Sequence, residues 1–311
     1  MPAPDHGLPQ PGKDRAQAGL TLWISVVILG VNWPVMKLGL EAVSPMWMAA
    51  LRFALTLPFA LAFALLANGR LPRLDRGDLP VILGVALLQF VAQMVLMTLA
   101  LQRVAAGTAS ILVYTTPLWL TLVDWILSGR PPARRRALST LLSTLGCLAV
   151  VVASGIAQAL PLGLILLASL CWSLSIRLVA WHRWRGEVSD ALFWQWTLAA
   201  AILLPLAFLA EGPPAATALS WRGIACLLFI GPVASGLGFG LMIYAGRHLS
   251  APRVTLTSTA APVIGYLSST LILAEPLRPA IILGGALILA AIATGIARPA
   301  RPGVAQDMGR V

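Results

Sequence analysis

Apolar residues fall in long runs along this chain, and the runs are separated by short segments that collect Arg, Asp, Gly and Pro. A bilayer core is spanned by an α-helix of roughly 20 apolar residues, and a helix satisfies all of its backbone hydrogen-bonding groups internally. The pattern therefore predicts an all-α integral membrane protein with ten transmembrane helices. These helices are predicted at residues 19–40, 46–67, 80–101, 106–128, 137–157, 160–180, 190–210, 222–245, 251–273 and 279–298.

The composition agrees with this pattern, because 59 % of the residues are hydrophobic, only 11 % are charged, and the mean hydropathy is +0.86. The two ends of the chain differ from the rest. Residues 1–17 and 299–311 are rich in Pro, Gly and charged residues, and we predict disordered tails there. The first apolar run ends in a turn rather than at a small-residue cleavage site, so we interpret it as a retained helix and not as a signal peptide.

The basic residues predict an orientation. If both termini are cytoplasmic, 17 of the 22 Lys and Arg residues lie on the cytoplasmic side, as the positive-inside rule requires. The other five are Lys37, Arg52, Arg103, Arg222 and Arg278. We therefore expect a multi-pass protein of the cell inner (plasma) membrane with both termini in the cytoplasm. The same rule accounts for the net charge of +11 and for the basic run at 130–136, so we expect no nucleic-acid partner.

The two halves of the chain repeat each other. Pro117 and Pro262 occupy matching places in the fourth and ninth runs, and residues 129–131 (Gly-Arg-Pro) answer residues 274–276 (Ala-Glu-Pro). Five helices in each half require the second half to enter the membrane upside down. Inverted repeats are typical of secondary transporters, whose substrate site lies near the midplane beside helices broken by Gly or Pro. The predicted repeats are residues 18–158 and 159–298.

Several segments give the chain a resemblance to a known family. They are Gly30–Lys37, Leu51-Arg52-Phe53, Ala106–Ser110 with Pro117, and Leu273-Ala274-Glu275-Pro276. Over residues 18–297 the chain resembles the EamA-type family of the drug/metabolite transporter superfamily. The resemblance implies ten helices, cytoplasmic termini and export of small metabolites such as amino acids or drugs. Arg130 departs from the family pattern, because family members often carry an acidic residue at this place, after the glycine that corresponds to Gly129. The role of Arg130 stays open.

Polar, charged and aromatic side chains inside the predicted helices are candidates for substrate binding. A charged residue at membrane depth is costly unless it is paired or functional, and aromatic walls with a few hydroxyls and amides suit a small amphipathic or cationic solute. Snorkelling of the cations, their pairing with Glu41 or Glu275, and hydrogen bonding between helices are the structural alternatives. The substrate-binding candidates are Trp33, Lys37, Arg52, Gln93, Tyr114, Thr115, Trp172, Thr257 and Thr259.

A second group of residues is expected to act in coupling or gating. Asp124 is our candidate for a proton- or gate-linked carboxylate, and the alternative is an ion pair with Arg177, Arg253 or Arg130. Glu275 ends the ninth run, and the two matched prolines would interrupt their helices. A glycine in the eighth run would let that helix bend, unless it serves only close helix packing. This group consists of Asp124, Glu275, Pro117, Pro262 and Gly236.

Other chemistries are disfavoured. The three Cys lie in apolar runs and the three His in tails or loops, so neither a metal cluster nor a Ser–His–Asp arrangement is expected. There is no GxxxxGK[ST] motif to bind ATP. We predict no enzyme, no cofactor and no metal. The prediction is a secondary transporter that exports amino acids or related amphipathic or cationic metabolites by alternating access of the two repeats. A flippase for lipid-linked substrates and a membrane-embedded lipid enzyme are the alternatives.

The expected partners are a small-molecule substrate and the lipid bilayer, and a homodimer stays open. The substrate, the direction of net flux and the coupling ion do not follow from the sequence.

Overall fold

The computed structural model describes residues 11–295, apart from the side chains at 11–15, 156, 251 and 252. Residues 1–10 and 296–311, and with them most of both predicted tails, lie outside the described part. One correction concerns the N-terminal tail, which we expected to run to residue 17. Helix α1 already begins at Pro11, and proline suits a first helical position because its fixed φ is helical and its missing N–H is not needed there.

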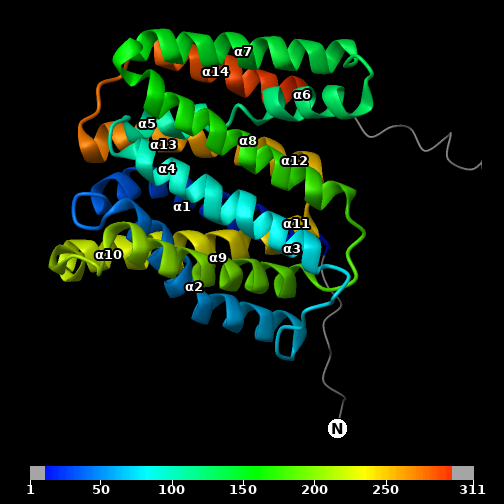
Figure 1. Ribbon diagram of the computed structural model, residues 1–311. Coiled ribbons are helices and arrows are strands. Elements are labelled where there is room, and N and C mark those ends of the chain that lie inside the picture. The colour runs from blue at the N-terminus through cyan, green and yellow to red at the C-terminus, as the bar shows by residue number, and fades with distance from the viewer. Residues whose placement is uncertain (1–10, 296–311) are drawn as a thin grey trace, which may run out of the picture.

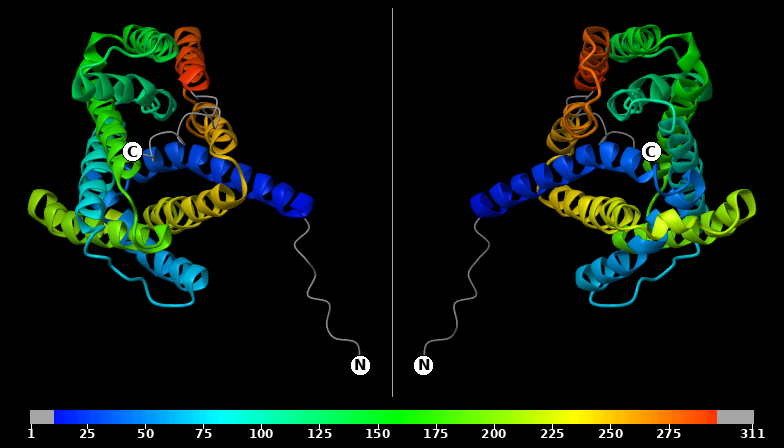
Figure 2. Two further views of the ribbon diagram at one scale, coloured as in Figure 1. Left: turned by 90° about the vertical axis from the view of Figure 1, so that its right-hand side faces the viewer. Right: turned by 90° about the vertical axis from the view of Figure 1, so that its left-hand side faces the viewer.

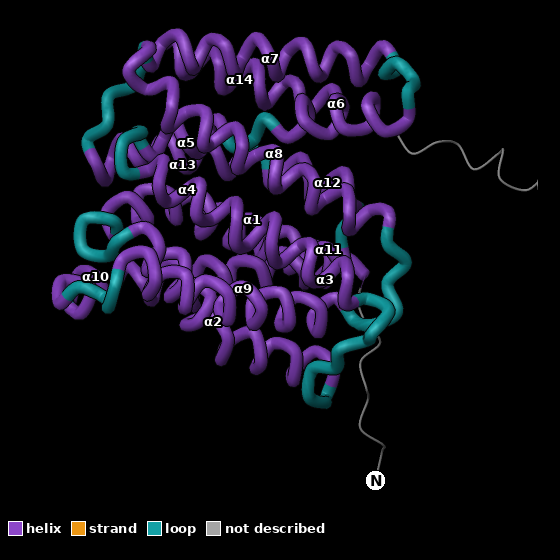
Figure 3. Tube along the Cα trace, in the orientation of Figure 1, coloured by secondary structure: helices purple, strands orange, loops and turns teal. Residues whose placement is uncertain are grey.

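The described residues form helices joined by short loops, without strands (Figure 3). Within residues 11–295, nine spans are long and apolar enough to cross a membrane, and the tenth is the 17-residue apolar helix α14. This confirms the all-α membrane fold with two inverted five-helix halves. The unbroken helices are α1 (Pro11–Gly39), α2 (Pro45–Asn68), α7 (Arg134–Ser154), α8 (Ala159–Trp181), α9 (Val188–Glu211) and α14 (Pro279–Gly295).

The other four spans are interrupted, and they are the third and fourth of each half. The third spans carry a π-helical segment. In such a segment the backbone hydrogen bonds join residues five positions apart rather than four. They are α3 (Leu79–Val85), η1 (Ala86–Ala92) and α4 (Gln93–Leu101) in the first half, and α10 (Trp221–Leu228), η4 (Phe229–Gly238) and α11 (Phe239–His248) in the second. The fourth spans are α5 (Ala106–Leu112) with α6 (Thr116–Ser128), and α12 (Ala251–Ser258) with α13 (Ala260–Leu273).

Both breaks in the fourth spans precede a proline. Pro117 is the second residue of α6 and Pro262 the third of α13. Proline lacks the N–H that would continue the helix and restricts the backbone of the residue before it. The sequence match between the two prolines therefore corresponds to a structural match between the halves.

Equivalent helices of the two halves pack together. The pair α7 and α14 forms one edge of the molecule and the pair α2 and α9 the other, with α1, α4, α8 and α13 between them (Figures 1 and 2). Glycines allow the closest of these contacts. A Cβ built on Gly146 of α7 would lie 2.6 Å from the carbonyl oxygen of Gly284 of α14, so no larger residue fits without separating the two backbones.

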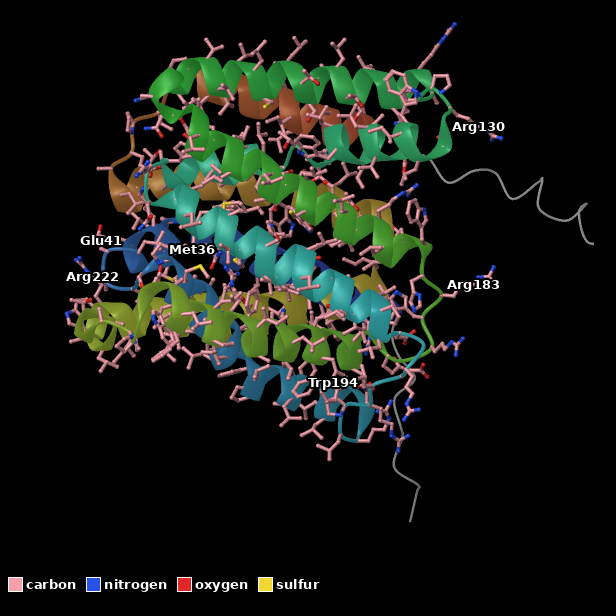
Figure 4. The ribbon with its side chains drawn as sticks, viewed as in Figure 1. Met36, Glu41, Arg130, Arg183, Trp194 and Arg222 are labelled. Atoms are coloured by element: carbon pink, nitrogen blue, oxygen red, sulfur yellow. The ribbon has the colours of Figure 1, made fainter. Side chains whose placement is uncertain are left out.

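The two ends of the bundle differ in charge. Arg130 and Arg183 project from one end, which we call the basic end, and Glu41 and Arg222 lie at the opposite end (Figure 4). The loop between α2 and α3 adds Arg70, Arg73 and Arg76 to the basic end. The structure thus separates the basic loops from the others as the sequence predicted.

Candidate functional site

A cavity of about 140 Å³ lies in the interior, near the middle of the spans, and both halves contribute to it. Its walls come from α1, α2, η1, α4, the break after α5, α8, α9, η4 and α11. Aromatic and sulfur-containing side chains dominate these walls. The lining residues are Leu29, Asn32, Trp33, Met36, Arg52, Phe53, Gln89, Phe90, Gln93, Met94, Met97, Val113, Tyr114, Trp172, Trp196, Ser235, Phe239 and Met242.

The two π-helical segments help to build this cavity. Segment η1 presents Gln89 and Phe90 to it, and η4 presents Ser235. The Oγ of Ser235 donates to the carbonyl oxygen of Ile230, five residues earlier, at 2.9 Å. Because that hydrogen bond uses the Ser235 proton, the oxygen lone pairs remain available toward the cavity. Helix segments of this kind often occur at functional sites.

The guanidinium of Arg52, on α2, donates to the hydroxyl oxygen of Ser235. Its side chain is only 5 % exposed, and its Nε donates to Ser235 Oγ at 2.7 Å. Its Nη1 faces the sulfur atoms of Met36 at 3.2 Å and Met94 at 3.6 Å. Among the described residues no carboxylate lies within ion-pair distance of Arg52. Gly231 makes the contact between α2 and η4 close enough for this arrangement, since a Cβ there would lie 2.8 Å from Arg52 O.

Aromatic rings form the remaining walls in edge-to-face pairs. Tyr114 and Trp172 meet with ring centroids 5.7 Å apart at 86°, and Phe90 contacts both Phe53 at 5.4 Å and Trp196 at 6.2 Å. Such pairs are more favourable than face-to-face stacking and hold the rings in fixed orientations. The rings therefore give the cavity a rigid apolar surface for the body of a solute.

Within the described part of the chain, two polar atoms of the cavity lining are buried without a hydrogen-bond partner. One is Nε1 of Trp196 and the other is Oδ1 of Asn32, whose Nδ2 faces Met36 Sδ at 3.1 Å. Most buried polar atoms of native proteins have a partner. A buried donor and a buried acceptor left over in one cavity indicate a place for a polar ligand.

Five of the nine predicted substrate-binding residues line this cavity. They are Trp33, Arg52, Gln93, Tyr114 and Trp172.

The other four, Lys37, Thr115, Thr257 and Thr259, lie outside this cavity. Lys37 donates to the carbonyl oxygens of Leu101 and, at 2.9 Å, of Val104, so it stabilises the C-terminal end of α4, where the helix dipole favours a cation. Thr115 donates to Ser169 Oγ at 3.1 Å within the helix break. Thr257 and Thr259 belong to α12 and its junction with α13, away from the cavity lining.

Sequence reasoning did not select several lining residues. Asn32 is adjacent to Trp33, and Gln89 precedes Gln93 by one helical turn, so both could have been found from their neighbours. Phe90 and Phe239 are aromatic residues in apolar runs and look like ordinary core, whereas Trp196 lies as deep in its run as Trp172 does and could have been found in the same way. Ser235 depends on the π-helical register of η4, which the sequence does not reveal.

Asp124 lies in an ion-pair cluster near the basic end. It accepts from Arg136 Nη1 at 3.0 Å and is paired with Arg177, whose guanidinium stacks 4.7 Å above the ring of Trp181. Arg177 was among the predicted partners and Arg136 was not. The cluster borders a separate cavity of about 240 Å³ between α6, α7, α8 and α14.

Glu275 lies at the opposite end, between the two broken fourth spans. Ala274 has a left-handed backbone with φ of 53°, which turns Glu275 back over the first turn of α5. Its carboxylate accepts from the backbone N–H groups of Ala106 at 2.7 Å and Gly107 at 2.9 Å. Instead of pairing with Lys37 or Arg52, Glu275 therefore caps a helix N-terminus, where negative charge is favoured.

Of the remaining gating candidates, Pro262 and Gly236 lie at close contacts between helices, and Pro117 is bonded within its own helix α6. Pro262 O accepts from Ser110 Oγ at 3.2 Å, which joins the two broken spans. The Thr121 hydroxyl bonds Pro117 O at 2.8 Å. A Cβ on Gly236 would lie 3.1 Å from Phe59 Cβ, so this glycine serves close packing of η4 on α2, and its part in bending stays a prediction.

Comparison with known proteins shows which family this chain matches. The model of the EamA-like transporter family matches residues 17–152 and again residues 160–295. A Bacillus subtilis (strain 168) protein named "uncharacterized transporter YvbV" is 26 % identical over 89 % of this chain and 91 % of its own length. A Salmonella typhimurium protein named "probable amino-acid metabolite efflux pump" is 26 % identical over 88 % and 93 %. A solved crystal structure shares the fold with a TM-score of 0.57 and 19 % identity, over 90 % of this chain and 97 % of the other.

Proposed function

Because this chain belongs to the EamA-like transporter family, we propose that it exports amino acids or related amphipathic metabolites from the cytoplasm across the inner membrane. The observation that carries the proposal is the central cavity, which lies between the two inverted halves and has a few polar groups on an aromatic wall. A relative of similar length carries the name of an amino-acid metabolite efflux pump. The family is one of transporters and not of enzymes, as the sequence predicted.

We place the basic end in the cytoplasm, because Arg130, Arg183 and the arginines of the α2–α3 loop gather there. Export then requires the cavity to open alternately to that end and to the opposite end. The fourth spans support this scheme. At the opposite end, α13 packs against α5 under the Glu275 cap. At the basic end, α6 packs against α7 and α8. In the described part of the chain, α6 does not pack against α12 to a comparable extent. One end is thus more firmly closed than the other.

Metabolite export can be measured directly. Cells that overproduce the intact chain and cells that overproduce Trp172→Ala are compared for external and internal metabolites by mass spectrometry. Trp125→Ala is the matched control, because Trp125 is 49 % exposed on the outside of α6, away from the cavity. We expect a specific amino acid or related compound to accumulate outside the cells with the intact chain and the control, and not with Trp172→Ala.

Two results would contradict this proposal. If external metabolites are equal in all strains while the lipid species change, the alternative of a lipid-linked substrate flippase replaces export of small metabolites. If Trp172→Ala and Trp125→Ala export equally well, the central cavity is not the transport site.

A further inference from the structure

Arg52 is the one charged side chain among the described residues that line the central cavity. A guanidinium keeps its proton in proteins, and a buried charge without a partner is strongly disfavoured. The neighbours of Arg52 do not neutralise it. Ser235 Oγ is a neutral acceptor, and the sulfur atoms of Met36 and Met94 are weak ones.

A comparison with Lys37 shows that this fold can satisfy a half-buried cation with backbone groups alone. Lys37 is bonded to two backbone carbonyl oxygens at the end of α4. Arg52 has no carbonyl partner and no carboxylate partner among the residues that the structure describes. Its Nε is fixed by Ser235, and its Nη1 is directed to methionines that themselves line the cavity. The guanidinium is therefore positioned but not satisfied.

Other groups of the cavity complement this picture. Trp196 is 2 % exposed, and its Nε1–H has no acceptor. It is a second buried donor in the same cavity. No acidic side chain is among the lining residues that the structure describes, so these residues offer no ionic partner to a cation. The charge of the cavity favours an anion and opposes a cationic solute.

We propose that Arg52 is the centre of an anion site in the central cavity, and that each solute is bound together with one monovalent negative charge at its guanidinium. This inference rests on the proposed function, since it names the class of substrate for the same cavity. The charge has two sources of the same chemistry, the carboxylate of the transported solute or a free chloride ion. The site excludes the cationic metabolites that the sequence left open.

The test uses the purified full chain in detergent and follows its thermal unfolding in sodium acetate, in sodium chloride and in sodium sulfate of equal ionic strength. The variants are Arg52→Met, Arg52→Lys and, as a control that removes a half-buried cation outside the cavity, Lys37→Met. We expect acetate to raise the Tm of the intact chain and of Lys37→Met in a concentration-dependent manner. The loss of charge-assisted hydrogen bonds should weaken the apparent acetate affinity of Arg52→Met by about ten- to a hundredfold.

The arms separate the two sources of charge. Stabilisation by acetate alone assigns the site to the carboxylate of the solute, and stabilisation by both acetate and chloride shows that a halide also occupies it. Arg52→Lys keeps the charge but loses the planar fork that fits a carboxylate, so it should bind acetate more weakly than the intact chain and provides the comparison if Arg52→Met does not fold. The proposal is overturned if neither anion acts differently from sulfate, or if the Arg52 variants respond as the intact chain does.

An export assay with the same variants distinguishes the anion-site proposal from the broader proposal of metabolite export. The three solutes are a neutral zwitterionic amino acid, a simple carboxylate and a cationic amine. If the intact chain exports the amine as well as the carboxylate, the anion site is refuted while the exporter function stands. If it exports none of the three while acetate still binds at Arg52, the exporter function is contradicted for these solutes and the anion site stands.

Discussion

The Glu275 cap is the contact whose energetic contribution can be estimated most directly from this structure. Its carboxylate accepts from two buried backbone N–H groups, those of Ala106 and Gly107, at the first turn of α5. The residue at the N-cap position is Ala105, whose side chain has no acceptor. Glu275→Ala therefore leaves both N–H groups without their partner and removes the negative charge from the positive end of the helix dipole.

The expected cost follows from these two losses. A hydrogen bond to a charged group contributes about 1.5–3 kcal/mol, and removing a side-chain cap costs about 0.5–2 kcal/mol. Since water reaches part of the site after truncation, we expect Glu275→Ala to lower the free energy of unfolding by about 2–4 kcal/mol. Glu275→Gln keeps one acceptor oxygen and loses the charge, so its effect should be about half as large.

Thermal unfolding of the purified chain in detergent measures both variants. Glu41→Ala is the matched control, because it removes a carboxylate from the same end of the molecule. Glu41 pairs with Arg222 at 3.0 Å, but the two side chains are 57 % and 54 % exposed, and exposed pairs contribute about 0–1 kcal/mol. Equal Tm shifts for Glu275→Ala and Glu41→Ala would refute the capping argument.

Three further predictions concern other parts of the molecule. Burial raises the pKa of Asp78, but hydrogen bonds from His182 and two backbone N–H groups outweigh burial and hold this pKa below the ordinary value of 3.8. The ionised Asp78 therefore stabilises the fold above pH 3.8. The difference in stability between the intact chain and Asp78→Asn should vanish as the pH falls further. Gly146→Ala should destabilise by about 1–3 kcal/mol in a denaturation assay, whereas Gly163→Ala, with open space around its Cβ, should be neutral or stabilising. Asp124→Asn should lower the Tm and leave the pH profile of export unchanged if two arginines hold a purely structural carboxylate, and a shifted profile would support the proton-linked role instead.

The helices could be predicted from sequence because the bilayer sets their length and their composition together. Predicted and observed limits agree closely at residues 106–128, where Gly129 follows the run, and at residues 251–273, where Pro276 lies three residues beyond it. They differ where helix propensity extends beyond the apolar run. Helix α7 begins at Arg134 rather than at residue 137, because arginine is a good helix former although it is not apolar.

The cavity could be predicted only in part, for a physical reason. A deep tryptophan or an intramembrane arginine stands out in any apolar run, so Trp33, Trp172 and Arg52 could be found. Whether a cation finds hydrogen-bond acceptors depends on backbone groups that are remote in sequence. Lys37 finds two such carbonyl oxygens and Arg52 finds none among the described residues, a difference that the sequence does not show. The π-helical register that brings Ser235 to Arg52 has no hydrophobic signature, because one extra residue per turn does not change the composition of the span.

The two halves are equal in topology but not in their end contacts. The repeat matches Gly129-Arg130 with Ala274-Glu275, and both Gly129 and Ala274 have a left-handed backbone. In the second half this turn brings a carboxylate to the N-terminus of α5. In a form closed at the basic end, the same turn would bring Arg130 toward the N-terminus of α12, where a cation is unfavourable. Under the proposed alternating-access scheme, closure at the basic end relies on other contacts, whereas closure at the opposite end has the Glu275 cap. This inequality would favour the form that the structure shows.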